Sequence, residues 1–132
     1  MKIAEMGKVV FDQRDIENVL ARLEPEELDR LTFGAIQVDS DGKVLFYNAT
    51  EGDLSKRDPK NIVGKNFFAD VAPCCRRPEF HGRFLEGVKA GSLDTTFEYL
   101  FDYKMNPTKV RIRMTNGNRA GEYWILVRRL ND

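Results

Sequence analysis

The sequence has few of the side chains that metal sites and thiol enzymes require. Its 132 residues include one histidine, His81, and two cysteines, Cys74 and Cys75, which are adjacent. A structural zinc site needs four spaced ligands, and this set cannot supply them. Neighbouring cysteines bridge only with strain, because disulfide geometry needs a larger separation. A nucleophilic Cys74 would need His81 as a base and a third group to orient it, and no such group is evident. We therefore expect neither a metalloprotein nor an enzyme.

Long apolar runs and an excess of one charge are also missing. No stretch approaches the roughly 18 apolar residues of a membrane-spanning helix, so we expect no membrane partner. Residues 1–7 lack the apolar segment of a secretory signal, which predicts a cytoplasmic protein with reduced thiols. The 21 basic and 21 acidic residues balance. This balance removes the usual electrostatic basis for nucleic-acid binding.

The patterns that are present predict a single α+β domain, which the chain length also favours. Apolar spacing and turn signals divide the chain into helical and extended segments. We expect two short helices in 11–31, a hairpin in 33–47 and irregular helical structure in 48–64. A loop that carries both cysteines follows, then a longer helix from Pro78 to Gly91 and strands near 97–103, 109–114 and 123–127.

The last strand, residues 123–127, is apolar on both faces and therefore needs cover on both sides. We expect the N-terminal helices to lie over Trp124 and Leu126, and the segment 48–91 to cover the other face. The order of elements predicts a PAS-type domain with a five-stranded antiparallel sheet. Residues 1–32 would form an N-terminal helical cap and residues 33–132 the ligand-binding core, within one domain.

The stretch from Asp70 to Arg77 holds both cysteines. Pro73 fixes its own φ angle and restrains the loop, so the Cys74 thiol is held in a defined place. This arrangement favours Cys74 as the attachment point of a chromophore, with the rest of the domain as its housing. The alternative is that Cys74 is a small buried apolar residue.

Other polar and aromatic residues could share a site with Cys74. Tyr47 and Glu51 are four residues apart, so one helical turn would bring them to the same face. A phenol and a protonated carboxylic acid donate hydrogen bonds to a small aromatic anion, and burial raises the pKa of a glutamate, which favours its protonated form. Arg57 follows closely, and the aromatic face of the 97–103 strand offers an apolar wall.

Each of these residues also has a simpler interpretation. Asn48 and Glu51 have the spacing of a capping box, in which Glu51 would cap its own helix. Tyr47 could be a core residue with its hydroxyl at the surface, and Arg57 an ordinary surface charge. His81 would be structural or exposed, and the aromatic face plain core. Spacing alone leaves these alternatives open.

The sequence resembles the photoactive yellow proteins over nearly all of the chain between Asp15 and Arg128. The cysteine loop, Asp70-Val71-Ala72-Pro73-Cys74, is one of the matching segments. The others are Asp15-Ile16-Glu17-Asn18, Phe33-Gly34-Ala35-Ile36-Gln37, Tyr47-Asn48-Ala49, Glu51-Gly52-Asp53, Arg57-Asp58-Pro59-Lys60, Gly64-Lys65-Asn66-Phe67-Phe68, Phe97-Glu98-Tyr99, Phe101-Asp102-Tyr103 and Pro107-Thr108-Lys109-Val110. Members of this family are small cytoplasmic blue-light receptors with a PAS fold.

The resemblance implies a p-coumaric acid (4-hydroxycinnamic acid) chromophore, joined by a thioester to Cys74. It implies that Tyr47 and protonated Glu51 hold the phenolate oxygen, with a supporting hydroxyl from Ser55. The backbone N–H of Cys74 would hold the thioester carbonyl. Arg57 would close the pocket against solvent.

The resemblance also extends the pocket to residues beyond these polar groups. Arg57 would lie near Phe101 and Tyr103, and Met105 would assist the return of the chromophore from cis to trans in the dark. The remaining chromophore-binding residues that we expect are Ile36, Phe67 and Val71.

The implied signal begins with trans–cis photoisomerisation and transfer of the Glu51 proton to the phenolate. A buried carboxylate without a counter-charge is costly, so the domain would loosen and release residues 1 to about 31. The sequence contains no output domain, so we expect a separate downstream signalling protein to read this change.

Three positions depart from the best-known relatives, and other functions remain open. Ser55 and Cys75 replace threonines, and His81 replaces a tyrosine; Cys75 is the alternative attachment site. One alternative function is a PAS-like sensory module that binds a small ligand non-covalently. A flavin photosensor is disfavoured, because the Asn-Cys-Arg-Phe signature of that class is absent.

Overall fold

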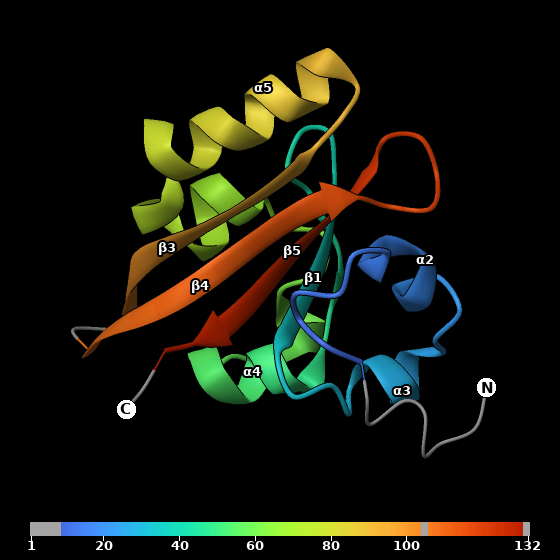
Figure 1. Ribbon diagram of the computed structural model, residues 1–132. Coiled ribbons are helices and arrows are strands. Elements are labelled where there is room, and N and C mark those ends of the chain that lie inside the picture. The colour runs from blue at the N-terminus through green and yellow to red at the C-terminus, as the bar shows by residue number, and fades with distance from the viewer. Residues whose placement is uncertain (1–8, 104–105, 131–132) are drawn as a thin grey trace.

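The computed structural model describes residues 9–103 and 106–130. Its centre is a five-stranded antiparallel sheet with the strand order β2-β1-β5-β4-β3 (Figure 1). The strands are β1 (Gly34–Asp39), β2 (Val44–Tyr47), β3 (Asp94–Tyr103), β4 (Asn106–Asn116) and β5 (Glu122–Arg129).

The β1–β2 hairpin has the turn that its sequence predicts. The Asp39 carboxylate accepts hydrogen bonds from the backbone N–H groups of Asp41 and Lys43, both at 2.9 Å. Gly42 has a φ of 90°, which a residue with a side chain rarely adopts. The register places Ile36 opposite Tyr47, so the end of β2 is fixed relative to β1.

Strand β5 lies between β1 and β4 and is buried on both faces. Ile125 is opposite Ile36 of β1 and Met114 of β4, and all three side chains are fully buried. These three residues belong to the main core cluster. Trp124 and Leu126, on the other face of β5, belong to a second buried cluster. The prediction that this strand is covered on both sides is therefore confirmed.

The second cluster joins this face of the sheet to the N-terminal segment, which carries α2 (Ile16–Leu20) and α3 (Pro25–Leu28). Figure 1 shows these helices, in blue, on the opposite side of the sheet from α5. The buried Arg113 of β4 fixes the start of this segment, because its guanidinium donates hydrogen bonds to the backbone oxygens of Phe11, Gln13 and Arg14.

The other face of the sheet is covered by short helices and one longer helix. They are α4 (Ala49–Ser55), η1 (Pro59–Asn61), η2 (Phe67–Val71), η3 (Pro73–Cys75), η4 (Pro78–Gly82) and α5 (Arg83–Ala90). The predicted helix from Pro78 begins as a π-helical turn, continues as α5 and ends at Gly91, whose φ is 76°. Phe80 and Phe84 point inward and are fully buried.

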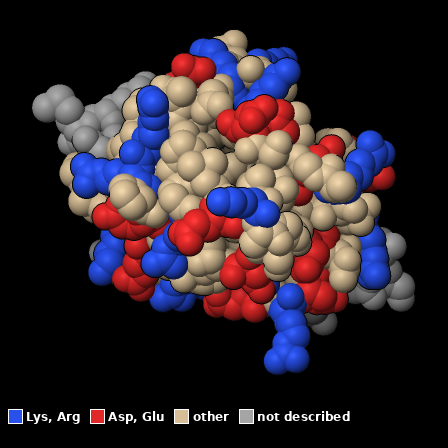
Figure 2. Space-filling model, turned by 90° about the horizontal axis from the view of Figure 1, so that it is seen from above, with Lys and Arg blue, Asp and Glu red and all other residues tan. Residues whose placement is uncertain are grey.

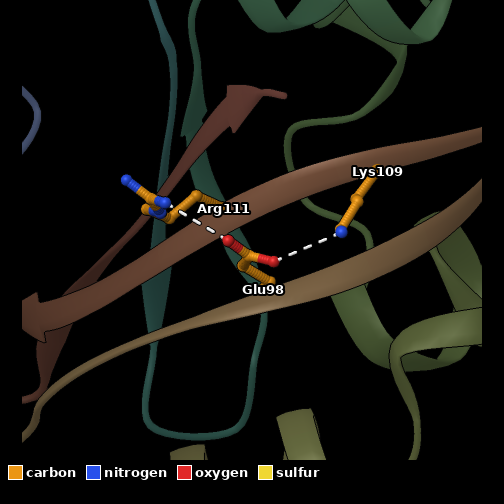
Figure 3. Close-up of polar contacts among 3 residues, drawn as sticks. All are labelled: Glu98, Lys109 and Arg111. Atoms are coloured by element: carbon orange, nitrogen blue, oxygen red, sulfur yellow. Dashed lines mark hydrogen bonds and ion pairs between the residues drawn. The ribbon is translucent and has the colours of Figure 1, made fainter. Parts of the chain in front are cut away.

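The exposed face of the β3–β4 ribbon is charged. Glu98 of β3 lies 3.2 Å from Arg111 and 3.5 Å from Lys109 of β4 (Figure 3). The hydrogen bond from Arg111 and the charge of Lys109 lower the pKa of Glu98. Such exposed pairs contribute little to stability.

On the face seen in Figure 2, acidic and basic side chains are interspersed without a large region of one sign. Within the described ranges, no helix is long and apolar enough to span a bilayer.

Candidate functional site

A cavity of about 230 Å³ lies between α4, the cysteine loop and β3. A cavity of this size has room for a ligand with a single aromatic ring. The lining residues are Tyr47, Glu51, Arg57, Phe67, Val71, Ala72, Pro73, Cys74 and Phe101.

Asn48 places Glu51 at the cavity. The Asn48 side-chain oxygen accepts hydrogen bonds from the N–H groups of Glu51 and Ala35, at 3.0 and 2.9 Å. Its amide nitrogen donates to the backbone oxygens of Leu28 and Phe33. The backbone N–H of Asn48 donates to Ala35 O, so it is not the group that the Glu51 carboxyl would cap in a capping box. Asn48 thus caps α4, and the buried Glu51 side chain faces the cavity.

Tyr47 and Ser55 form a short chain of hydroxyl groups beside Glu51. The Ser55 hydroxyl donates to the backbone oxygen of Glu51 at 2.7 Å, and it lies 2.8 Å from the Tyr47 hydroxyl. Because serine has a single hydroxyl proton, Tyr47 is the donor in the second bond. Burial, reinforced by the Glu51 carboxyl, raises the pKa of Tyr47, while Ser55 and Arg57 act in the opposite direction. Tyr47 therefore keeps its proton and serves as a hydrogen-bond donor.

Arg57 reaches the cavity because the chain reverses directly after α4. Lys56 has left-handed backbone geometry, with a φ of 61°, and ends the helix. The following turn packs tightly on Gly52, where an added Cβ would lie 2.8 Å from the backbone oxygen of Arg57. Arg57 is half-buried and lines the cavity, so its position is not that of an ordinary surface charge.

The cysteine loop is held by backbone and side-chain hydrogen bonds. Asn66 caps η2 by accepting from the N–H groups of Phe68 and Ala69, both at 3.0 Å. The Tyr99 hydroxyl donates to the backbone oxygen of Cys74. Cys74 is half-buried and faces the cavity, whereas Cys75 is fully buried in the core. Burial raises the pKa of the Cys75 thiol far above its ordinary value.

The aromatic residues divide between the cavity wall and the core. Phe67 and Phe101 line the cavity. Phe97 and Tyr99, on the same face of β3 as Phe101, pack edge-on against Phe80 instead, with ring centroids 5.3 and 5.2 Å away. The wall that we expected from the whole aromatic face is thus reduced, among the described side chains of that face, to Phe101.

The predicted site residues fall into three groups. Tyr47, Glu51, Arg57, Phe67, Val71, Cys74 and Phe101 line one cavity. Ser55 does not line the cavity but is hydrogen-bonded to the hydroxyl group of Tyr47, which does. Ile36 is buried in the core cluster that also contains Tyr47, and it is not one of the lining residues. The side chain of Tyr103 and the whole of Met105 lie outside the part that the structure describes.

Three residues that shape the site were not among the predicted site residues. Ala72 and Pro73 complete the wall beside Cys74. Gly34 of β1 lies against the Glu51 side chain. An isolated glycine within a strand often marks a close approach by another group, and this signal could have identified Gly34.

His81 lies outside this cavity, on η4. Its ring stacks on Phe68 with a centroid distance of 4.2 Å. Partial burial, together with the charge of Arg76, lowers the pKa of His81. In the described ranges, no group of three or more His, Cys, Asp or Glu residues is arranged to hold a metal ion.

The arrangement supplies four chemical functions to one small ligand. Cys74 offers a thiol for covalent attachment, and Tyr47 offers a hydrogen bond. Glu51 offers a buried carboxyl group. Arg57 offers a positive charge at the boundary of the cavity. Together these groups suit a small aromatic anion.

Comparison with known proteins supports the same family. A family model for the PAS fold matches residues 25–128. The chain is 54% identical over 125 residues to the photoactive yellow protein of Halochromatium salexigens, and 50% identical over 125 residues to that of Rhodothalassium salexigens. Each match covers 95% of this chain and 100% of the relative.

A solved structure agrees with the sequence comparison. The photoactive yellow protein domain of the sensor histidine kinase Ppr from Rhodospirillum centenum is 46% identical and superimposes with a TM-score of 0.83. That match covers 86% of this chain and 99% of the domain. The fold, the full-length identity and the matched residues lead to one assignment. The chain has a PAS fold and belongs to the photoactive yellow protein family.

Proposed function

We propose that this protein is a blue-light receptor that carries a p-coumaroyl group on Cys74 as a thioester. The observation that carries the proposal is the single cavity of about 230 Å³ shared by the Cys74 thiol, the Tyr47 phenol and the Glu51 carboxyl. Relatives at 54% and 50% identity are named photoactive yellow proteins, which supports the same function here. When bound, the p-coumaroyl group supplies visible absorption and a double bond that light isomerises.

In the dark, the chain's own groups hold the negative charge of a phenolate. Tyr47 would keep its proton and donate a hydrogen bond to the phenolate oxygen, which requires the Ser55 hydroxyl to turn and donate to Tyr47. Protonated Glu51 donates a second hydrogen bond. Arg57 balances the charge from the cavity boundary, and Phe67 and Val71 exclude water from the ring.

After illumination, Glu51 would release its proton to the bound group and become a carboxylate. Glu51 is only 2% exposed, so its new charge is formed in a poorly solvated place. Forming a charge in such a place carries a desolvation cost. The domain lowers this cost by opening and letting water reach Glu51.

The helix that carries Glu51 is hydrogen-bonded directly to the N-terminal segment. Asn48 donates to Leu28 O at 2.8 Å, and the Ala49 N–H donates to the Asp29 carboxylate at 2.7 Å. The Thr50 hydroxyl donates to Leu31 O at 2.6 Å. A displacement of α4 therefore disturbs α3, and residues 1–32 act as a cap that is released from the core, residues 33–132.

A downstream signalling protein would read the released cap and the sheet face beneath it. The structural relative from Rhodospirillum centenum is a domain of a sensor histidine kinase. A kinase of that class is accordingly the first partner to test, with this chain in its dark and illuminated forms.

The deciding experiment is an absorption spectrum of the protein mixed with an activated p-coumaroyl thioester. We expect a yellow band that bleaches in blue light, returns in the dark and is absent in Cys74→Ala. The matched control is Cys75→Ala, which retains the band. Folded protein that binds free p-coumaric acid without a covalent adduct would overturn the proposal in favour of a non-covalent PAS sensor. A band that survives in Cys74→Ala and disappears in Cys75→Ala would move the attachment site to Cys75.

A further inference from the structure

The two cysteine sulfurs lie close together but in different environments. Their separation is 4.0 Å, and both residues belong to the short helix η3. Cys74 is half-buried, and Cys75 has no exposed surface. The photoreceptor function uses one of these thiols, so the second thiol needs its own explanation.

Cys74 is reachable from outside the chromophore cavity. Besides that cavity, it lines an open groove of about 330 Å³ on the protein surface, together with Arg77, Tyr99 and Leu100. A small polar oxidant can reach Cys74 through this groove. Cys75 lines neither space, so its thiol meets such an oxidant only through Cys74.

We propose that Cys75 is a resolving cysteine that protects the attachment thiol, Cys74, against irreversible oxidation before the chromophore is attached. A hydroperoxide, ROOH, oxidises the Cys74 thiolate to a sulfenic acid and is reduced to the alcohol ROH. The Cys75 thiol, which burial keeps protonated, then attacks the sulfenic sulfur and passes its proton to the departing hydroxyl group, so that an S–S bond forms while the S–OH bond breaks and water leaves. In sum, two thiols and one hydroperoxide give one disulfide, one alcohol and one water. A sulfenic acid beside a second thiol commonly follows this route.

The bond formed in this way is a temporary state. A disulfide between adjacent residues is strained, because their Cα atoms are closer than disulfide geometry prefers. Strained disulfides are the ones that cellular thiols reduce easily. Without a resolving thiol, the sulfenic acid proceeds to sulfinic acid, which is irreversible for most proteins. Cys75 therefore converts permanent damage at Cys74 into a reversible block.

The consequence for the receptor rests on the proposed function. A Cys74 in a disulfide cannot form a thioester, so the oxidised protein does not accept a chromophore until it is reduced. Once the thioester has formed, Cys74 has no thiol, and the pair cannot be oxidised. The switch thus acts on loading and leaves the loaded receptor unaffected.

The test uses the full-length protein prepared without chromophore and treated with hydrogen peroxide. Intact mass should show the loss of two hydrogen atoms in the monomer, and digestion should map the bond to Cys74 and Cys75. Treatment with dithiothreitol should restore the original mass. Cys75→Ala should instead gain two or three oxygen atoms at Cys74 that dithiothreitol does not remove; Cys75→Thr should behave identically, and circular dichroism should show both variants folded.

Loading provides a second readout. After peroxide, we expect wild-type protein to form the yellow band only when it is first reduced, and Cys75→Ala to have lost loading permanently. Equal accumulation of sulfinic acid in wild type and Cys75→Ala would overturn the proposal, as would a disulfide formed only between chains. Failure of the photoreceptor function would appear separately, as reduced and untreated wild-type protein that forms no band.

Discussion

Gly34 of β1 and Glu51 of α4 are packed so closely that no side chain fits between them. A Cβ atom at Gly34 would lie 2.0 Å from Glu51 Oε1 and 3.0 Å from Glu51 Cβ. The backbone of β1 therefore forms the wall against which the carboxyl group rests. This contact fixes the Glu51 side chain from the side of the sheet, while Asn48 fixes its helix.

Gly34→Ala should displace the Glu51 carboxyl group. We expect a loss of about 1–3 kcal/mol in the free energy of unfolding, as for other overpacked sites, and a changed absorption maximum in the loaded protein. Urea denaturation and a visible spectrum measure the two effects. The matched control is Gly82→Ala, whose added Cβ would meet its nearest neighbour at an ordinary 3.7 Å. Equal stability of the two variants would contradict the close packing.

Glu51→Gln should uncouple light absorption from release of the N-terminal segment. The amide still donates a hydrogen bond, but it cannot become a buried carboxylate. A charge formed at this buried position carries a desolvation cost, and roughly 1.4 kcal/mol is enough to change an equilibrium tenfold. Light-induced hydrogen exchange in residues 9–31 should therefore fall at least about tenfold relative to wild type. Exchange that rises in light as it does in wild type would exclude Glu51 as the source of the opening.

Arg113→Met should loosen the N-terminal segment in the dark. Arg113 is 7% exposed, and its guanidinium donates to the backbone oxygens of Phe11, Gln13 and Arg14. Hydrogen bonds of a charged group contribute about 1.5–3 kcal/mol each, so we expect faster exchange in residues 9–20 and lower stability. Arg111→Met is the matched control, since Arg111 pairs with the exposed Glu98 and should change stability by about 1 kcal/mol at most. Similar exchange in both variants would show that Arg113 does not anchor the segment.

His81 should make the fold less stable in mild acid. Partial burial and Arg76 lower the pKa of His81 in the folded protein, so between the folded value and about 6.5 the unfolded chain binds more protons. Stability must then rise with pH across this window and be lost as the pH falls below about 6.5. His81→Phe keeps an aromatic ring against Phe68 and should remove that slope. The measurement is urea unfolding of both proteins at several pH values, and parallel curves would exclude the effect.

Local structure followed from local sequence signals. Asp39 and Gly42 predicted the hairpin turn. The turn forms there because the Asp39 carboxylate accepts backbone hydrogen bonds and Gly42 adopts the positive φ that the turn requires. Pro25 and Pro78 each begin a helix, because a proline at the first helical position lacks only an N–H that the helix does not use. Tyr47 and Glu51 were paired by their spacing and by the resemblance, and both line the cavity.

The tertiary structure decided how distant segments meet. An alternating strand pattern says which face is buried but not which strands are neighbours, so the position of β5 between β1 and β4 could not be read from the sequence. The close packing of Gly34 against Glu51 could not be read from the sequence either. Nor could the hydrogen bond from Asn48 to Leu28, which is 20 residues away. The sequence by itself determined the strands, the hairpin turn and most of the helices and, through the matched segments, the family; the short helices η2 and η3 lie where a loop was expected. The contacts that orient Glu51 and hold the N-terminal segment required the fold, because they join residues that only the packed sheet brings together.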